Sequence, residues 1–194
     1  MQTAAKGITQ WLTRHGAIRQ EDHSLYEYAI YSLMLTIAPL FIVMIIGCLM
    51  GLVLESVIFI LPFMVVRKYS GGFHMKHAWT CLICSCTVLF LSIYVTEGIE
   101  CSNVLSIVTL GAVVSLGICS PIDSNNRQLT LVERSKYKRV TIMIVMCFFV
   151  IYGLLLMIRC DGYAKWIAVG LILPAVLQMP AAVKKLADRY RGRD

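Results

Sequence analysis

The stretch from Arg67 to Cys81 concentrates the residues of this chain that could carry out chemistry. It reads RKYSGGFHMKHAWTC and contains a fixed cation, a glycine pair, two imidazoles and a thiol. A cysteine thiolate is a strong nucleophile, and a histidine imidazole can exchange protons with it. The pattern therefore predicts a thiol nucleophile with its base, placed where one hydrophobic segment ends and the next begins.

The spacing of His74 and Cys81 constrains how they could meet. They are seven positions apart, so a straight helix would put them on one face but about 10 Å apart along its axis, too far for a hydrogen bond. Gly71 and Gly72 permit a sharp turn just before His74, which would let the imidazole fold back over the next helix. Cys81 in the first turns of that helix would have its thiolate favoured, and free backbone N–H groups could stabilise an oxyanion.

Other pairings in the same stretch fit the spacing equally well. His77 and Cys84 repeat the seven-residue interval, and His77 stands four residues before Cys81. A metal site built from these histidines and cysteines is conceivable, but no second ligand cluster and no nearby carboxylate match a structural zinc pattern. We therefore expect no metal and no cofactor. A purely structural role for His74, as a helix cap or an interfacial anchor, stays open at this point.

Composition identifies the class of protein. Of 194 residues, 58% are hydrophobic and 15% charged, with a mean hydropathy of +0.74; soluble domains carry about 25% charged residues. The formal net charge is +7. The sequence shows no basic groove interleaved with aromatic residues, which is typical of nucleic-acid binding, so no nucleic-acid partner is expected. Most of the eight cysteines lie in apolar runs and do not form a disulfide framework.

The hydropathy pattern predicts an all-α fold, a polytopic membrane protein with about six transmembrane helices. The predicted segments run over residues 29–50, 53–66, 78–96, 104–119, 140–158 and 166–179. The second is short for a full crossing, so it could be re-entrant or form a hairpin with the first.

We expect a single integral membrane domain over residues 1–194, with a cytoplasmic N-terminal segment (1–28), the bundle (29–180) and a basic cytoplasmic tail (181–194). The N-terminal segment lacks the pattern of a cleavable signal peptide. It fits either a partly ordered tail or an amphipathic helix on the membrane surface, in which Ile8, Trp11, Leu12 and Ile18 recur at helical spacing.

Positive charge alternates from one connection to the next. Lysine and arginine gather before residue 20, at 67–77, at 120–139 and in the tail, whereas the other connections hold few cations. By the positive-inside rule, both termini and the stretch from Arg67 to Cys81 face the cytoplasm. The lipid bilayer is thus one partner, and a homodimer is compatible with the available lipid-facing surface.

The segment Arg67-x-x-Ser-Gly-Gly-Phe-His74, followed by Cys81, resembles the signature of the accessory gene regulator B (AgrB) family. The likeness extends to the chain length and to Ser120-Pro121-Ile122-Asp123 with the basic stretch behind it. The members of this family are bacterial cell-membrane cysteine endopeptidases that process quorum-sensing propeptides. The resemblance implies that Cys81 is the nucleophile and His74 its base, with Arg67 and Gly72 at further positions needed for activity and Gly71 beside them. Asp123, Glu133 or a backbone carbonyl could orient His74.

The resemblance also implies a substrate, a propeptide of the AgrD type with an amphipathic leader, a core and an acidic tail. Cys81 would cleave at the core–tail junction and hold the core as a thioester, which a core thiol or hydroxyl would displace to close a thiolactone or lactone. The basic residues of 127–139 and of the tail could bind the acidic tail, or act as topology determinants beside anionic lipids. The competing hypotheses are a membrane peptide transporter or exporter without covalent chemistry, and a non-catalytic scaffold.

Overall fold

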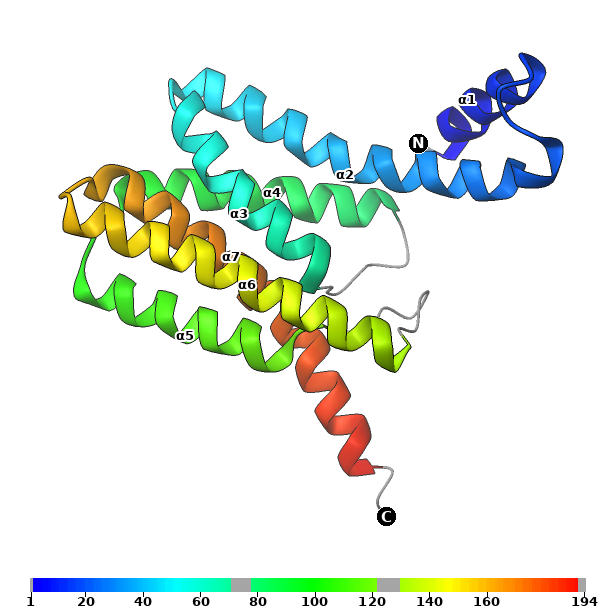
Figure 1. Cartoon of the computed structure of the whole chain (residues 1–194). Coiled ribbons are helices and arrows are strands. Elements are labelled where there is room, and N and C mark those ends of the chain that lie inside the picture. Colours follow the sequence, from blue (N-terminus) through cyan, green and yellow to red (C-terminus); the bar gives the residue numbers. More distant parts are fainter. Residues whose placement is uncertain (1, 71–77, 122–129, 192–194) are drawn as a thin grey trace.

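The structure, a computed structural model, describes residues 2–70, 78–121 and 130–191 (Figure 1). These residues form α-helices and one short 3-10 helix, with no strand among them, which confirms the all-α prediction. In chain order the elements are α1 (Gln2–Arg14), η1 (Gln20–Asp22), α2 (His23–Met50), α3 (Val53–Ser70), α4 (Ala78–Gly98), α5 (Asn103–Cys119), α6 (Leu131–Met157) and α7 (Asp161–Arg191).

The second predicted segment forms a helix of its own. Gly51 ends α2 in the left-handed conformation, with φ 71°, and its N–H donates to the Cys48 carbonyl, as is common for a glycine that follows a helix. The 18 residues of α3 continue past the predicted end at residue 66 to Ser70. At about 1.5 Å per residue, α3 is about 27 Å long, so it is longer than its apolar core suggested.

The N-terminal part of α6 corrects one sequence-based prediction. The basic stretch before residue 140 was expected to be a loop, but α6 begins at Leu131. Thr130 caps it: its Oγ1 accepts from the Glu133 N–H at 3.3 Å, and the Glu133 carboxylate accepts from the Thr130 N–H at 3.0 Å. Two orphan backbone donors are satisfied in this way, so the cations of residues 134–139 stand on a helix.

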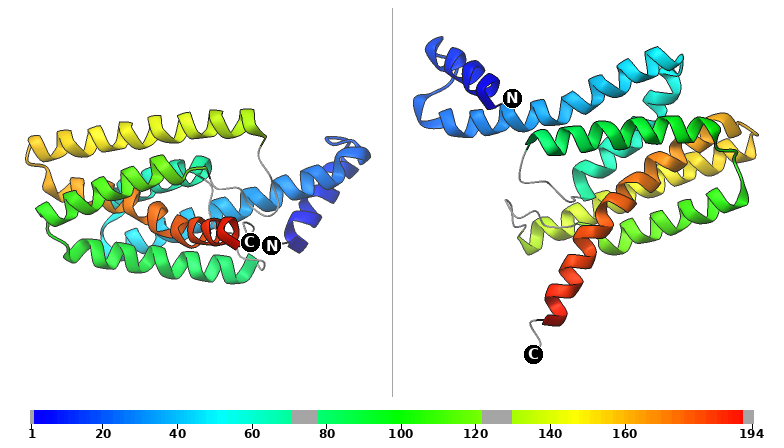
Figure 2. Two further views of the ribbon diagram at one scale, coloured as in Figure 1. Left: turned by 90° about the horizontal axis from the view of Figure 1, so that it is seen from below. Right: turned by 180° about the vertical axis from the view of Figure 1, so that it is seen from behind.

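Helix α7 is the central element of the bundle and contacts α3, α4, α5 and α6. It extends beyond the predicted 166–179 at both ends, and its C-terminal part projects from the bundle (Figure 2). One buried cluster surrounds Leu116, Val145 and Leu171, between α5, α6 and α7. The other surrounds Trp166 and Phe59, where α7 meets α3, α4 and α2.

Gly170 allows α7 and α3 to pack at close range. A Cβ atom at this position would lie 2.6 Å from Pro62 Cγ and 2.7 Å from the Phe59 carbonyl oxygen. No other residue type could occupy the position without moving a helix, because the obstacle includes backbone. Small residues at such crossings let membrane helices gain van der Waals contact.

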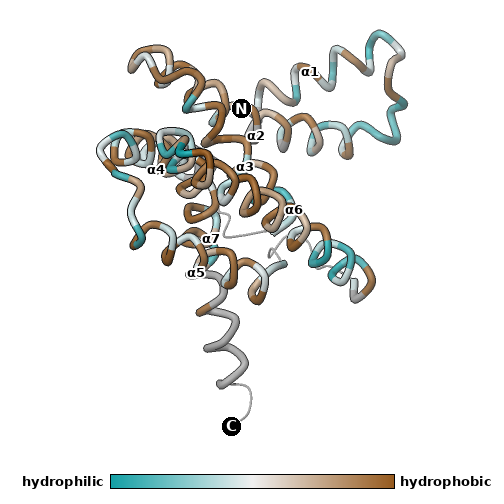
Figure 3. Tube along the Cα trace, turned by 60° about the vertical axis from the view of Figure 1, so that its left-hand side comes forward, coloured by the Kyte–Doolittle hydropathy of each residue, from teal (hydrophilic) through white to brown (hydrophobic). Residues whose placement is uncertain are grey.

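The outer surface of the helices is apolar, which indicates a membrane protein. Leu49, Ile107, Ile118 and Met157 are among the large hydrophobic side chains that the fold leaves exposed, and an apolar surface of this extent needs a partner other than water. Hydrophobic residues dominate the bundle helices, whereas hydrophilic residues gather at the start of α6 and around the turn after α1 (Figure 3).

Within the described residues, Val132–Met157 and Asp161–Pro180 are long and apolar enough to cross a bilayer, and three further apolar helical stretches are shorter. The three are Ile37–Met50, Ile83–Gly98 and Asn103–Cys119. The count of six spans stays a prediction.

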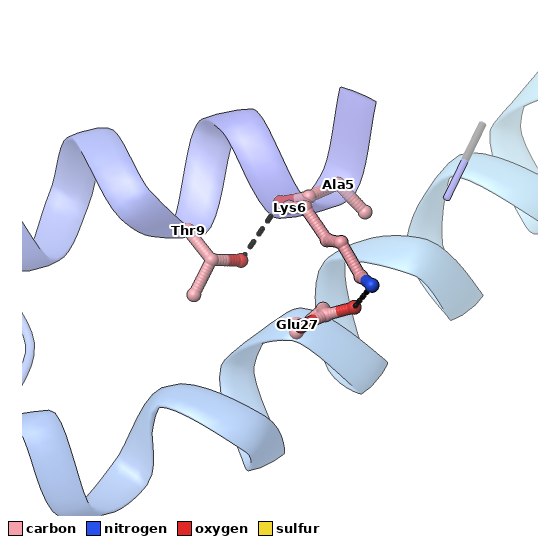
Figure 4. Close-up of polar contacts among 4 residues, drawn as sticks. All are labelled: Ala5, Lys6, Thr9 and Glu27. Carbon is pink, nitrogen blue, oxygen red and sulfur yellow. Dashed lines mark hydrogen bonds and ion pairs between the residues drawn. The ribbon is translucent and has the colours of Figure 1, made fainter. Parts of the chain in front are cut away.

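The predicted N-terminal helix is present as α1, docked on α2 through buried Ala5 and Thr9. Figure 4 shows the polar contacts there: the Thr9 hydroxyl donates to the Ala5 carbonyl at 2.8 Å, and Lys6 lies 3.9 Å from Glu27 of α2. An exposed ion pair of this kind contributes about 0–1 kcal/mol, so burial holds the helix more than charge does.

The apolar residues named in the sequence do not share one environment. Ile8 and Trp11, 43% and 59% exposed, point away from α2 and form a face suited to a membrane surface. Ile18 lies beyond the end of α1 and is buried. The prediction that Ile18 belongs to the amphipathic face is therefore wrong.

Candidate functional site

One end of the bundle gathers the C-termini of α3 and α5 with the N-termini of α4 and α6 (Figures 1 and 2). Arg67 lies half-buried in the last turn of α3. The centroid of the Tyr69 ring, also on α3, lies 6.1 Å from that of the Tyr137 ring on α6. This aromatic contact brings the C-terminal end of α3 next to the N-terminal part of α6. His74, Gly71, Gly72 and Asp123 lie outside the described residues, and their roles stay predictions.

Cys81 occupies the fourth position of α4, where the backbone is described. The first four N–H groups of a helix have no partner within it, and the positive end of the helix dipole lies there. Both effects stabilise a thiolate and a developing oxyanion nearby. The start of α4 thus has the electrostatics that a cysteine nucleophile needs.

The register of α4 separates Cys81 from Cys84. At about 100° per residue, positions 88 and 92 lie within about 20° of position 81 around the helix axis, and Val88 and Ser92 are half-buried on the side that faces the bundle. Position 84 shares its side with Leu91, and both Cys84 and Leu91 are exposed. Position 81 therefore shares its face of the helix with these half-buried residues, whereas position 84 lies on the exposed side.

Cys101 lies at the far end of α4 from the candidate site, between α4 and α5. Burial raises the pKa of the Cys101 thiol and the Asp161 carboxylate raises it further, with smaller opposing effects from Lys165 and from a hydrogen bond with Tyr152. A thiol with a raised pKa is a poor nucleophile at neutral pH. Cys101 is therefore unsuited to the role expected of Cys81.

Glu133 was one of three groups that could orient His74. In the structure its carboxylate caps α6 instead. Its carboxylate accepts hydrogen bonds from the Thr130 N–H and hydroxyl, both at 3.0 Å. This is a helix-capping role, and it leaves Asp123 or a backbone carbonyl as the simpler choices for His74. The alternative metal site stays a prediction, because His74 and His77 lie outside the described residues; elsewhere in the described chain no three metal-binding side chains gather.

Sequence reasoning missed Gln178, which ties two helix ends together at this end of the bundle. Its side chain on α7 is 1% exposed. The Nε2 group donates to the Ser70 carbonyl at 3.3 Å and to Ser120 Oγ at 3.0 Å, and Ser120 Oγ also lies 3.4 Å from Oε1. A lone amide in an otherwise apolar segment is the signal that could have found it.

A groove of about 630 Å³ runs along the first turns of α6. Among the described residues it is lined by Val132, Ser135, Lys136, Arg139, Val140 and Met143. Lys136 and Arg139 lie about one turn apart and give the groove a positive charge, while the remaining lining is mostly apolar. The groove could accept a segment with acidic and apolar side chains.

The family model of accessory gene regulator B matches residues 5–179. AgrB-like proteins of Listeria innocua and Listeria monocytogenes are each 24% identical over 89% of this chain and 84% of the relative. An AgrB-like protein of Clostridium perfringens is 26% identical over 60% of this chain and 58% of that protein.

No solved structure matches the chain. The family match covers most of the chain and includes both Arg67 and Cys81. The chain therefore belongs to the accessory gene regulator B family, and this membership indicates a role in processing the autoinducer of a quorum-sensing system.

Proposed function

We propose that this protein is a membrane cysteine endopeptidase that removes the C-terminal tail of an AgrD-type propeptide and closes the remaining core into a ring. The observation that carries the proposal is the position of Cys81 in the first turn of α4. The backbone N–H groups of a helix start and the helix dipole favour a thiolate and an oxyanion. Family membership supplies the substrate class.

The first step is acyl transfer to Cys81. The thiolate attacks the carbonyl carbon at the core–tail junction, and the oxyanion that forms is stabilised by N–H groups at the start of α4. His74 gives a proton to the leaving amine, the C–N bond breaks, and the tail departs. The core remains bound to Cys81 as a thioester, which keeps the acyl group activated.

The second step closes the ring. A thiol or hydroxyl of the core attacks the thioester, His74 accepts its proton, and the C–S bond to Cys81 breaks to return the thiolate. No oxidant or reductant is needed, because every step is an acyl transfer. Water must be kept from the thioester for ring closure to exceed hydrolysis, and a site at the boundary of the membrane suits that requirement.

The remaining predicted residues have supporting roles. Gly71 and Gly72 permit the turn that brings His74 back towards Cys81, and Asp123 or a backbone carbonyl orients the imidazole. Arg67 offers a planar fork to a substrate carboxylate. The distribution of cations supports a cytoplasmic location for this end of the bundle, where a reducing environment keeps Cys81 free.

The test is cleavage by the purified protein in detergent micelles, where no compartments exist and transport cannot be observed. Wild-type protein incubated with the propeptide of its own organism should release the tail fragment, and hydroxylamine should convert the bound core to a hydroxamate by intercepting the thioester. Mass spectrometry identifies both products. An intact propeptide after prolonged incubation with folded protein would favour the transporter hypothesis instead.

The groove on α6 supplies a place for the acidic tail of the substrate. Lys136 and Arg139 complement its charge, and Val132, Val140 and Met143 offer apolar contact. Two cations are enough to attract and bind the acidic tail of the substrate, and they need not take part in the reaction itself.

Reversal of one groove charge, Lys136→Glu, should raise the KM for the propeptide by about five- to tenfold, the effect of about 1 kcal/mol of electrostatic attraction. The kcat should change little, because the proposal gives the groove a role in binding the tail and none in the chemistry. Steady-state cleavage at low and high salt measures both constants, and added salt should narrow the difference between variant and wild type.

Lys138→Glu is the matched control, since Lys138 is on the same helix, carries the same charge and does not line the groove. Equal KM values for the two variants would contradict the groove assignment and leave only a general effect of net charge.

A further inference from the structure

Gln178 is a buried polar side chain, 1% exposed, at the end of the bundle that carries the candidate site. A buried amide is costly in an apolar setting unless its groups are paired, and here they are paired with two other helices. Ser70 is the last residue of α3, and Ser120 follows the last residue of α5. One side chain of α7 thus contacts the points where two helices of the bundle end.

The contact with Ser70 has a specific electrostatic consequence. The last carbonyls of a helix have no partner within it, and the Ser70 carbonyl belongs to a residue that is fully buried. The Gln178 N–H group satisfies that oxygen at 3.3 Å. An apolar side chain of the same size would fill the space but would leave the carbonyl without this donor, which favours a shift of the helix end.

The same helix end carries Arg67, within one turn of Ser70. The hydrogen bond from Gln178 therefore joins this end of α3 to α7. Ser120 fixes the end of α5 in the same way, with its own N–H bonded to the Leu116 carbonyl at 3.1 Å. The amide side chain holds the two ends at one distance from each other and from α7.

We propose that Gln178 is a positioning residue for the cleavage reaction, which holds the Arg67-bearing end of α3 against α5 and α7 so that the substrate junction stands correctly at Cys81. This rests on the function proposed above. Gln178 contacts no reacting atom; it acts through Ser70 and Ser120. A packing role alone would be served as well by a methionine of similar shape.

The experiment replaces Gln178 by methionine and measures kcat and KM for tail release, each per mole of folded protein. We expect kcat to fall by about tenfold or more, because misplacement of a bound substrate slows the chemistry. The KM should change less than about twofold, since most substrate contacts remain. Ser120→Ala removes one of the two tied helix ends and should give a smaller loss of kcat.

Tyr152→Phe is the matched control. It removes an interhelical hydrogen bond of similar length, 2.8 Å to Ser106 Oγ, between α5 and α6, away from Ser70 and Ser120. Both variants should lose a comparable amount of stability, but Tyr152→Phe should keep the wild-type kcat. Equal losses of kcat would show that Gln178 contributes only to folding and would overturn the proposal.

A second measurement needs no substrate. Hydrogen–deuterium exchange should increase in peptides that contain Arg67–Ser70 and Leu116–Ser120 in Gln178→Met, and stay unchanged there in Tyr152→Phe.

If wild-type protein fails to cleave, the proposed function fails, and exchange still decides whether Gln178 holds the helix ends. If Gln178→Met does not fold, Ser120→Ala carries the same test. Wild-type kcat and wild-type exchange in both would refute the positioning role.

Discussion

Replacement of Cys81 by alanine should abolish tail release from the propeptide, by about a thousandfold or more, and should remove the hydroxylamine-trapped core as well. Loss of a covalent nucleophile has effects of this size, since the residual rate comes only from binding and oxyanion stabilisation. Detergent-solubilised protein, cognate propeptide and chromatography of the tail fragment measure it. The folded fraction should stay at the wild-type level.

Cys84→Ala is the matched control, because it makes the same change three positions along the same helix. Cys84 is exposed on the outer side of α4, so its loss should leave cleavage within about twofold of wild type. Normal cleavage by Cys81→Ala together with an inactive Cys84→Ala would reverse the assignment. Loss of activity in both would point to a site that needs several thiols, as a bound metal does.

Gly170→Ala should lower the stability of the protein by about 1–3 kcal/mol, the usual cost of overpacking a tight contact. The added methyl group would meet Pro62 and the Phe59 carbonyl at distances well below van der Waals contact. Because part of the obstacle is backbone, α3 or α7 must move to accommodate it. The midpoint of thermal or denaturant unfolding in lipid nanodiscs measures the change.

Gly111→Ala provides the comparison. Gly111 lies on α5, and a Cβ atom there would meet nothing within 4 Å. The substitution should leave stability unchanged or raise it slightly, since glycine in a helix costs about 0.5–1 kcal/mol relative to alanine. Identical unfolding midpoints for the two variants would refute the close crossing of α3 and α7.

Hydropathy predicted the helices well where their ends are marked by apolar residues. The segment 104–119 and α5 agree almost residue for residue because Ser102 caps the helix directly before its apolar run. At the start of α6 the helix is polar, so hydropathy does not detect it. The signal there is Thr130 followed by Glu133, a capping box whose pattern is local and could have been recognised in the sequence.

At the candidate site, the sequence indicates some residues but not others. Cys81 could be selected as a candidate nucleophile because its neighbours in sequence form a recognisable motif and because a helix starts next to it. Gln178 could not be given its partners from sequence, since they lie 108 and 58 residues away. Such contacts depend on how α3, α5 and α7 pack, which follows in part from the fit of Gly170 against Pro62.

The position of α7 has a consequence for synthesis of the protein. Every bundle helix that it contacts precedes it along the chain, and chains are made from the N-terminus onwards. Until the ribosome has added α7, Pro62 and Ser70 lack the groups they pack against and bond to in the finished protein. A nascent chain can therefore insert its earlier helices, Cys81 included, without yet assembling the end of the bundle around it. By this order of events, the proposed cleavage activity would begin only when α7 has joined the other helices.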